Sequence, residues 1–411
     1  MPEIVQIETP PPVKSVLFPE IKIKNIALFY LLTTFNNLWF IAGNWIFFWT
    51  RFMTYGQLGW VDASAFAFGL LMEVPSGAVS DLLGKKRTIV ASMLLAAISI
   101  FGFASASSLT QIWISFMFAQ LGWALYSGSA EALAYDTLVD RNKEQSYDKV
   151  ISTSGTIATI SAITATLLGG LFYVIHFRLP HYAWAFAYAL AFFISLFLTE
   201  PKIDTEKFSL NSYVKQLYRG TVELFKPQLQ AFVVVIFVLL GADYLYSWGL
   251  IKPAMATSFG FFDKEQAILF ALFGIVGAIL VKFIPSYRKY ISDKRGLYFL
   301  SLVMGSGFML AFFKLGYLGV IPLFLIAVSG QLAYPWVSIV VNREIASKYR
   351  ATTLSTVALI SKLPYALLAI TAGAMVENGT FHIFNLTIGS VIIASIVVSS
   401  IQRLIKIKLK R

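Results

Sequence analysis

Four charged side chains interrupt long apolar stretches of this 411-residue chain: Glu73, Glu131, Asp243 and Lys362. Placing such a group at the centre of a membrane costs about 2.5–3.5 kcal/mol on insertion scales, so each one is a candidate for function. A carboxylate in this setting can take up and release a proton, and an ammonium group can pair with it. We therefore expect proton exchange or an ion pair among these four residues. Asp62, near the outer end of its apolar stretch, is expected at the interface between membrane and water.

A second set of side chains could bind an organic molecule. Asn37, Phe40 and Asn44 follow one another at steps of three and four residues, so one helix face would alternate amide and aromatic groups. Such a face suits a ligand that both stacks and forms hydrogen bonds. Other candidates for the same pathway lie in separate apolar stretches: Gln120, Ser127, Glu131, Asp243, Tyr246, Gln331, Tyr334 and Trp336. The chain has 36 Phe, so many aromatic side chains must instead serve packing or lipid contact, and Lys362 could form a purely structural ion pair.

Catalytic and metal-binding patterns are missing from the sequence. It contains no HExxH, no GxSxG, no phosphate-binding loop and no cysteine, and its three histidines are scattered. These absences argue against an enzyme, a metal site and a bound cofactor.

The composition is that of a membrane protein. Hydrophobic residues make up 57% and charged residues only 13% of the chain, with a mean hydropathy of +0.72, whereas soluble domains carry roughly 25% charged residues. A membrane-spanning helix needs about 20 mostly apolar residues. Twelve stretches qualify: 24–50, 57–81, 88–106, 110–138, 149–175, 181–199, 229–252, 265–284, 297–315, 318–342, 351–376 and 380–402. None alternates with the period of two that a membrane β-strand requires, so we expect an all-α fold.

Basic residues define the expected orientation. With twelve spans, 27 of the 33 Lys and Arg fall on the side that carries both termini. Because cytoplasmic loops collect Lys and Arg, both termini are expected in the cytoplasm and the chain in the inner cell membrane. The net charge of +12 is then a consequence of topology and requires no nucleic-acid partner.

The longest connection divides the spans six and six. The expected organisation is a tail at 1–23, a six-helix bundle at 24–199, a cytoplasmic linker at 200–228, a second bundle at 229–402 and a basic tail at 403–411. The middle of the linker could be an amphipathic helix on the membrane surface or a solvated connection. Gly122 and Tyr126 in the first half correspond to Gly330 and Tyr334 in the second, which indicates an internal repeat of the kind common in transporters.

The stretch GAVSDLLGKKR, residues 77–87, resembles the loop signature of the major facilitator superfamily: Gly, three residues, Asp, a base, any residue, Gly, then two or three bases. The residues that fit are Gly77, Asp81, Gly84, Lys85, Lys86 and Arg87. Leu82 departs from the pattern, because the family usually has a base there. With twelve basic-inside spans the resemblance covers nearly the whole chain, and SGSAEALAYDTL is similar to segments of bacterial facilitators of undefined substrate.

This resemblance implies two six-helix bundles that rock about a central cavity lined by spans one, four, seven and ten. Glu131 and Asp243 would then face the substrate pathway from opposite halves. The family loop acts as a conformational latch, which here would consist of Gly77, Asp81, Gly84, Lys85 and Arg87, with Asp136 as the acid of span four.

The cargo is less defined. Phe118 replaces the arginine that proton-coupled drug exporters carry four residues before the glycine of span four. The leading expectation is proton-coupled export of amphipathic or cationic organic compounds by a monomer, because the site is aromatic and acidic. The alternatives are a proton-coupled importer of a nutrient or vitamin-like solute, and a lipid translocase on the same fold. The expected partners are a small-molecule substrate, protons and the lipid bilayer.

Overall fold

The computed structural model describes residues 17–202, 209–226, 229–345 and 347–409, and every regular element in these ranges is helical. The first half contains α1 Lys24–Asn36, α2 Trp45–Trp49, α3 Tyr55–Leu83, α4 Lys85–Ser105, α5 Leu109–Asp140, α6 Tyr147–Ile175 and α7 Leu179–Ser195. After α8 Leu210–Leu224, the second half contains α9 Val233–Ser247, α10 Ile251–Ser258, α11 Asp263–Lys282, α12 Ile284–Tyr287, α13 Asp293–Leu310, α14 Val320–Glu344, α15 Ser347–Glu377 and α16 Phe381–Leu409. Short 3₁₀ turns lie at Glu144–Ser146 and Gly316–Gly319.

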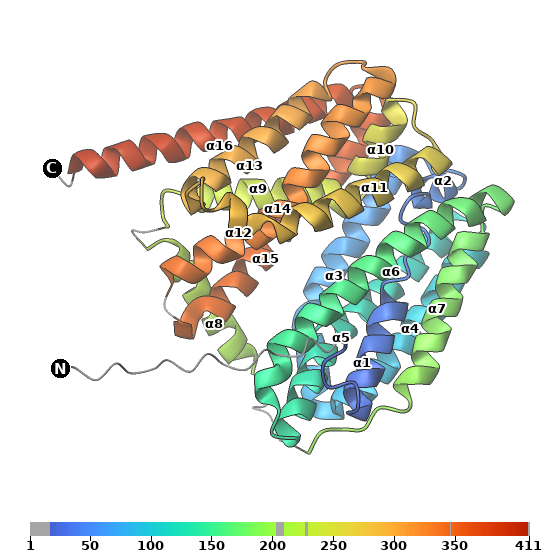
Figure 1. Cartoon of the computed structure of the whole chain (residues 1–411). Coiled ribbons are helices and arrows are strands. Elements are labelled where there is room, and N and C mark those ends of the chain that lie inside the picture. The colour runs from blue at the N-terminus through green and yellow to red at the C-terminus, as the bar shows by residue number, and fades with distance from the viewer. Residues whose placement is uncertain (1–16, 203–208, 227–228, 346, 410–411) are drawn as a thin grey trace, which may run out of the picture.

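Each of the twelve apolar stretches has a helical counterpart, and these helices form two bundles (Figure 1). In the described part of the chain, six helices are long and apolar enough to cross a membrane by length and composition, and the bent pair α9–α10 would make a seventh. Helix α1 falls short on length, with 13 residues, whereas α3 and α5 are long enough, with 29 and 32 residues, but are not among the six. The all-α prediction is confirmed.

Two helix pairs join the bundles, α3 with α15 and α6 with α11. Small residues allow the close approach: a Cβ added to Gly59 would lie 2.5 Å from the Ala369 carbonyl oxygen, and one on Gly170 would lie 2.6 Å from Ala267 Cβ. The bundles converge near α2 and α10 and separate toward α8 and the C-terminus (Figure 1). They therefore meet at the end that the charge pattern predicts to be extracellular.

The first span is broken, whereas the sequence predicted one helix over 24–50. Helix α1 ends at Asn36, and helix resumes only at Trp45. The Asn37 side chain turns back to donate to the Thr33 carbonyl oxygen at 2.8 Å. Asparagine competes in this way with the backbone bonds of a helix. The prediction of a continuous helical face in this span is therefore wrong.

The seventh span, which occupies the same place in the second half, is also broken. Helices α9 and α10 meet at an angle of 67° across the residues Trp248–Leu250. Gly249 lies at this bend, and a Cβ there would collide with the Tyr365 hydroxyl at 1.6 Å. Each half thus breaks its first span, and Trp39 and Trp248 lie in the broken segments.

Candidate functional site: a cavity between the bundles

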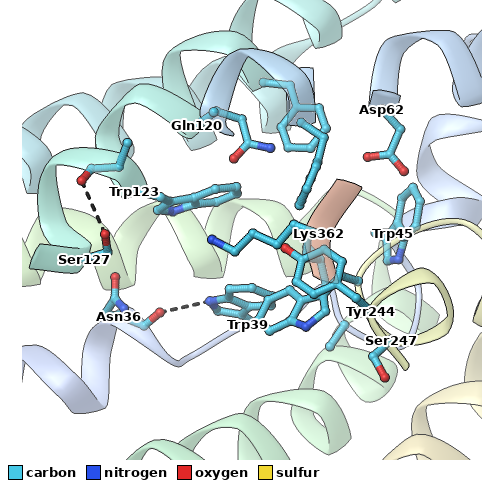
Figure 2. Close-up of a pocket in the computed structure, with 18 of the residues that line it drawn as sticks. Asn36, Trp39, Trp45, Asp62, Gln120, Trp123, Ser127, Tyr244, Ser247 and Lys362 are labelled. Carbon is cyan, nitrogen blue, oxygen red and sulfur yellow. Dashed lines mark hydrogen bonds between the residues drawn. The ribbon is translucent and has the colours of Figure 1, made fainter. Parts of the chain in front are cut away.

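A cavity of about 730 Å³ lies between the two bundles. Its lining comes from the broken first span, α3, α4, α5 and α7 of the first half and from α9, α10, α14 and α15 of the second half. A volume of this size suits a drug-sized or metabolite-sized ligand. Figure 2 shows its side chains pointing toward one another from both bundles.

Trp39 stands at the centre of this cavity because the first span unwinds around it. Its indole N–H donates to the Asn36 carbonyl oxygen at 2.9 Å (Figure 2). Its ring lies 6.1 Å from the ring of Trp123 in the same bundle and 5.5 Å from that of Trp248 in the other. The two helix breaks therefore meet through an edge-to-face contact of tryptophans.

Helix α5 presents one face to the cavity, with Gln120, Trp123 and Ser127 at steps of three and four residues. Behind this face, Trp123 Nε1 donates to the Tyr188 hydroxyl at 2.8 Å. The Tyr188 hydroxyl in turn donates to Asn36 Oδ1 at 3.2 Å. This chain of hydrogen bonds fixes the orientation of the Trp123 ring.

Two polar contacts cross from α3 to α15 at the cavity wall. Lys362 forms an ion pair with Glu73. Tyr365 donates a hydrogen bond to Asp62, whose side chain is buried at 4% exposure. Tyr365 also accepts a hydrogen bond from the Leu250 N–H at 3.3 Å, so it connects Asp62 to the break between α9 and α10. The prediction that Asp62 lies at the membrane interface is wrong, because Tyr365 gives the carboxylate a partner inside the protein.

The second half adds further charge. Asp243 Oδ1 accepts from the Ser247 hydroxyl at 3.0 Å, and Gly330 leaves the space that this carboxylate occupies. The Lys252 ammonium lies 4.5 Å from the centre of the Phe270 ring, a cation–π distance. The described lining thus contains three acids and two lysines.

Six of the residues predicted for the pathway or for coupling line the cavity: Glu73, Gln120, Ser127, Asp243, Gln331 and Lys362. Gln331 also donates to the Phe273 carbonyl oxygen at 3.0 Å. The structure therefore brings together predicted residues from five different spans.

The predicted residues of the first span lie outside the cavity lining. Asn37 bonds back to its own helix, and Phe40 packs on Phe172 with 5.6 Å between the ring centres. Asn44 is fully buried, and its amide donates to the Phe40 carbonyl oxygen at 3.3 Å. Because α1 ends at Asn36, the spacing that would align these side chains is lost.

Four other predicted residues also lie away from the cavity. Tyr246 is buried and donates to the Leu323 carbonyl oxygen at 3.1 Å, and Trp336 donates to the Asp293 carbonyl oxygen at 2.7 Å. Tyr334 and Glu131 are exposed at positions beyond the described lining. Glu131 lies one helical turn past Ser127, toward the predicted cytoplasmic end of α5.

The predicted latch residues lie around the start of α4. Lys85 and Asp136 form a buried ion pair whose side chains are 10% and 3% exposed. Gly84 has a φ of +89°, which favours glycine. The surroundings of Gly77 and Asp81 fall outside the described part of the structure, and Arg87 is exposed.

The N-terminus of α4 has an acidic cap that the sequence did not indicate. The Glu200 carboxylate accepts from the Lys85 N–H at 2.7 Å and from the Lys86 N–H at 2.8 Å. A carboxylate is favourable at this position because the backbone N–H groups at a helix start lack partners within the helix. Glu200 is more than 100 residues from Lys85 in the sequence, and its hydrogen bonds connect the end of the first bundle to the predicted latch.

A comparison with protein families now places the chain. The model of the Major Facilitator Superfamily matches residues 25–369. The chain belongs to this superfamily. It is therefore a multi-pass membrane protein with the twelve-helix fold of these transporters.

Solved structures share this fold at low sequence identity. The nucleoside transporter NupG is 16% identical, with a TM-score of 0.70 over 92% of this chain and 97% of that one. A D-xylose-proton symporter is 14% identical, with a TM-score of 0.67 over the same shares of the two chains. The human organic anion transporter MFSD10 is 15% identical, with a TM-score of 0.60 over 93% of this chain and 99% of that one. A comparison with curated protein sequences finds no match.

Several lining residues were missed by sequence reasoning: Asn36, Trp39, Trp45, Asp62, Trp123, Trp184, Trp248 and Lys252. Trp39 and Trp248 depend on helix breaks that helical periodicity conceals. The concentration of tryptophan around residues 39–49 was the available signal, because tryptophan is rare and amphipathic.

Proposed function

We propose that the protein is a secondary transporter that moves a small organic solute with a flat ring through this cavity by alternating access. One observation carries the proposal: Trp39, Trp123 and Trp248 surround a cavity that also carries the amides of Gln120 and Gln331. Indole faces stack on flat rings, and amides bond to their polar edges.

Export of amphipathic or cationic compounds is the favoured activity. The acids Asp62, Glu73 and Asp243 outnumber the bases Lys252 and Lys362 in the described lining, and the aromatic rings beside them attract cations. Since Glu73 is paired with Lys362, the remaining charged groups of the described lining are Asp62, Asp243 and Lys252, which together carry one formal negative charge.

Uptake of a nutrient is the second candidate. It is supported by the same combination of indole rings and amides, which also suits a nucleobase or a sugar ring. Two fold neighbours are described as a nucleoside transporter and a D-xylose-proton symporter, and their named solutes contain such rings.

Coupling to protons would act through the contacts between bundles. Asp62 accepts a hydrogen bond from Tyr365 across the α3–α15 contact, and Tyr365 also bonds to Leu250 directly before α10, at the end where the bundles converge. A deprotonated Asp62 would strengthen that bond and keep the outer end closed, whereas protonation would weaken it. With both termini in the cytoplasm, the present arrangement would be the inward-facing state of the cycle.

The test is transport by purified protein in proteoliposomes under an imposed pH gradient. Ethidium, a flat aromatic cation, and uridine, a nucleoside, represent the two candidates. Accumulation of ethidium against its gradient on the acidic side supports export, and accumulation of uridine on the alkaline side supports uptake. Movement of neither solute beyond that in protein-free liposomes would contradict the proposal.

A further inference from the structure

A carboxylate of the second bundle caps the start of a helix in the first bundle. Glu377, the last residue of α15, accepts a hydrogen bond from the Gly56 N–H in the first turn of α3 at 2.6 Å. The first N–H groups of a helix have no partner within that helix, and the N-terminus of a helix favours negative charge. The contact therefore combines a hydrogen bond with a favourable electrostatic interaction.

Glycine at position 56 leaves the space that this carboxylate occupies. A Cβ added to Gly56 would lie 2.5 Å from Glu377 Oε2. The rest of the helix start is capped locally, because the Thr54 side chain accepts from the Gln57 N–H at 3.3 Å. The Gln57 side chain in turn accepts from the Thr54 N–H at 3.0 Å. The Gly56 N–H is thus bonded by a residue of the other bundle.

The two helices approach each other closely behind this contact. A Cβ added to Gly373 of α15 would lie 2.3 Å from the Tyr55 carbonyl oxygen of α3. The start of α3 follows α2 in the chain and lies at the end where the bundles converge (Figure 1). Small residues at such a contact let two helix backbones come together. The Glu377 carboxylate is therefore placed by the packing of α15 on α3.

Carboxylates cap two other helix starts, and each of them belongs to the same bundle as the helix that it caps. Glu200 accepts from the Lys85 N–H at the start of α4. Glu265 accepts from the Phe262 N–H at 2.9 Å at the start of α11. Both of these caps can persist when the bundles move apart. The Glu377 cap exists only while the outer ends of the bundles are together.

The contact lies apart from the central cavity. Glu377 is exposed and lines a groove of about 600 Å³ with Thr54, Tyr55 and Gln57 of the α3 start. Gly56 and Glu377 are outside the described lining of the central cavity. A change at this contact can therefore alter the opening of the outer end without altering the groups that face the solute.

We propose that Glu377 is a gate residue of the transport cycle, which holds the outer end closed while the cavity is open toward the cytoplasm. The inference rests on the proposed function and specifies how its site is closed to the outside. In alternating access the outer ends of the bundles separate in one half of the cycle. The bond between Glu377 and Gly56 then breaks, and water replaces each partner. The intact bond stabilises the inward-facing state relative to the outward-facing one.

The test measures the distance between the outer ends of the bundles in purified protein in lipid nanodiscs. Because the chain has no native cysteine, spin labels at Thr110→Cys and Lys314→Cys report this distance. Glu377→Ala removes the acceptor and should raise the ratio of outer-open to outer-closed molecules about fivefold, the factor for one net hydrogen bond. Glu377→Gln keeps an acceptor oxygen and removes the charge, so its effect should be smaller.

Gly56→Ala separates the gate from general stability. Alanine favours a helix more than glycine does, so α3 itself gains helix propensity. The added methyl group displaces the Glu377 carboxylate. We expect the outer end to open as in Glu377→Ala, while the thermal unfolding midpoint stays close to that of the wild type. A role in stability alone would make the two measurements change together.

Glu265→Ala is the matched control, because it removes an exposed carboxylate cap that lies within one bundle. The distance between its outer ends should equal that of the wild type. Unchanged distances in Glu377→Ala, or an equal opening in Glu265→Ala, would overturn the proposal.

The proposed function fails separately from the gate. Opening in the Glu377 and Gly56 variants without movement of ethidium or uridine by the wild type removes the function and leaves the gate. Transport by the wild type with unchanged distances in these variants removes the gate and leaves the function.

Discussion

The two bundles face the same cavity with different chemistry. The first bundle contributes Trp39, Trp45, Trp49, Trp123 and Trp184, whereas Trp248 is the tryptophan that the second contributes to the described lining. The second bundle contributes Asp243, Lys252, Ser247, Gln331 and Lys362. Flat aromatic walls hold a ring, and charged groups respond to protons and to one another. The first bundle also contributes the acids Asp62 and Glu73 through α3, so the difference teaches that the tryptophans are concentrated in one half, whereas the charged groups come from both.

The ion pairs at the loop ends of the bundles also differ between the two halves. Lys85 at the start of α4 pairs with Asp136 on α5, and Asp293 at the start of α13 pairs with Arg343 on α14. These helices are the third and fourth spans of their halves, so the same contact occurs twice with its charges exchanged. The first pair is buried, but the Arg343 side chain is 64% exposed.

The electrostatics of the second pair include a further arginine. Partial burial acts to raise the pKa of Asp293, but its hydrogen bonds and charge interactions with Arg288 and Arg343 together outweigh burial and lower the pKa. Arg288 reaches the same carboxylate at 2.7 Å. The loop before α13 is thereby fixed to the end of α14.

Breaking the buried ion pair between Lys85 and Asp136 should have the largest effect on stability. Lys85→Met leaves the Asp136 carboxylate buried without its ion-pair partner, so we expect the free energy of unfolding to fall by about 3–5 kcal/mol. Thermal and denaturant unfolding of the purified protein measure it. The double variant Lys85→Met/Asp136→Leu should recover most of the loss, because no charge then remains buried. A double variant as unstable as the single one would contradict this account.

The bond between Asp62 and Tyr365 should have the next largest effect. A hydrogen bond to a charged group contributes about 1.5–3 kcal/mol, so Asp62→Asn or Tyr365→Phe should favour opening of the outer end roughly ten- to hundredfold. Because the chain has no native cysteine, spin labels at Thr110→Cys and Lys314→Cys can report the distance between the bundles.

Protonation of Asp62 should have the same consequence as its replacement. The outer end of the wild-type protein should open as the pH falls, and both variants should lose this dependence. Ser64→Ala is the control, since Ser64 accepts its hydrogen bond from Trp113 within the first bundle. Wild-type distances that do not change with pH would show that Asp62 is no switch.

The tryptophans of the two bundles should differ in what they control. Trp123 contacts three rings and is fixed by Tyr188, whereas Trp248 contacts Trp39 and Tyr244 at the break of the seventh span. Aromatic pairs contribute about 0.5–1.5 kcal/mol each, so Trp123→Leu should raise the apparent KM of a ring-bearing solute roughly tenfold.

Trp248→Leu should change the maximal rate more than the KM, because its contact with Trp39 joins the two helix breaks, and alternating access would move the two bundles relative to each other. Initial rates in proteoliposomes over a range of solute concentrations separate the two effects. Equal changes of KM in the two variants would remove the distinction between the tryptophans of the first bundle and Trp248 of the second.

Breaking the exposed ion pair between Asp293 and Arg343 should have the smallest effect on stability. Arg343→Met is expected to lower the free energy of unfolding by at most about 1 kcal/mol, because solvent screens the pair and Arg288 remains. The lowered pKa of Asp293 determines how this stabilisation depends on pH. The pair stabilises the folded protein fully above the ordinary pKa of an aspartate, and this stabilisation is lost as the pH falls through the lowered pKa. The free energies of unfolding of the variant and the wild type should therefore become equal in acid. A difference between them that grows in acid would contradict this prediction.

Sequence alone determined the class of this molecule. Twelve apolar stretches, the basic loops and the 77–87 signature indicated the superfamily, because hydropathy and helix length are local properties that a bilayer enforces. Charged residues inside spans also pointed to the cavity, since Glu73, Asp243 and Lys362 are costly unless they serve a purpose there. The family resemblance grouped Lys85 and Asp136 among the latch residues, and the structure pairs them.

Only the tertiary structure decided which residues share the cavity. Because helix α1 ends at Asn36, Trp39 lines the cavity and Asn44 does not. The helical period of the sequence does not predict where a helix ends inside a span. Partners such as Tyr365 for Asp62 and Glu200 for the start of α4 are separated from them by more than 100 residues. Local sequence sets which groups are costly in a membrane, but packing between distant helices decides which of them are paired and which line the cavity.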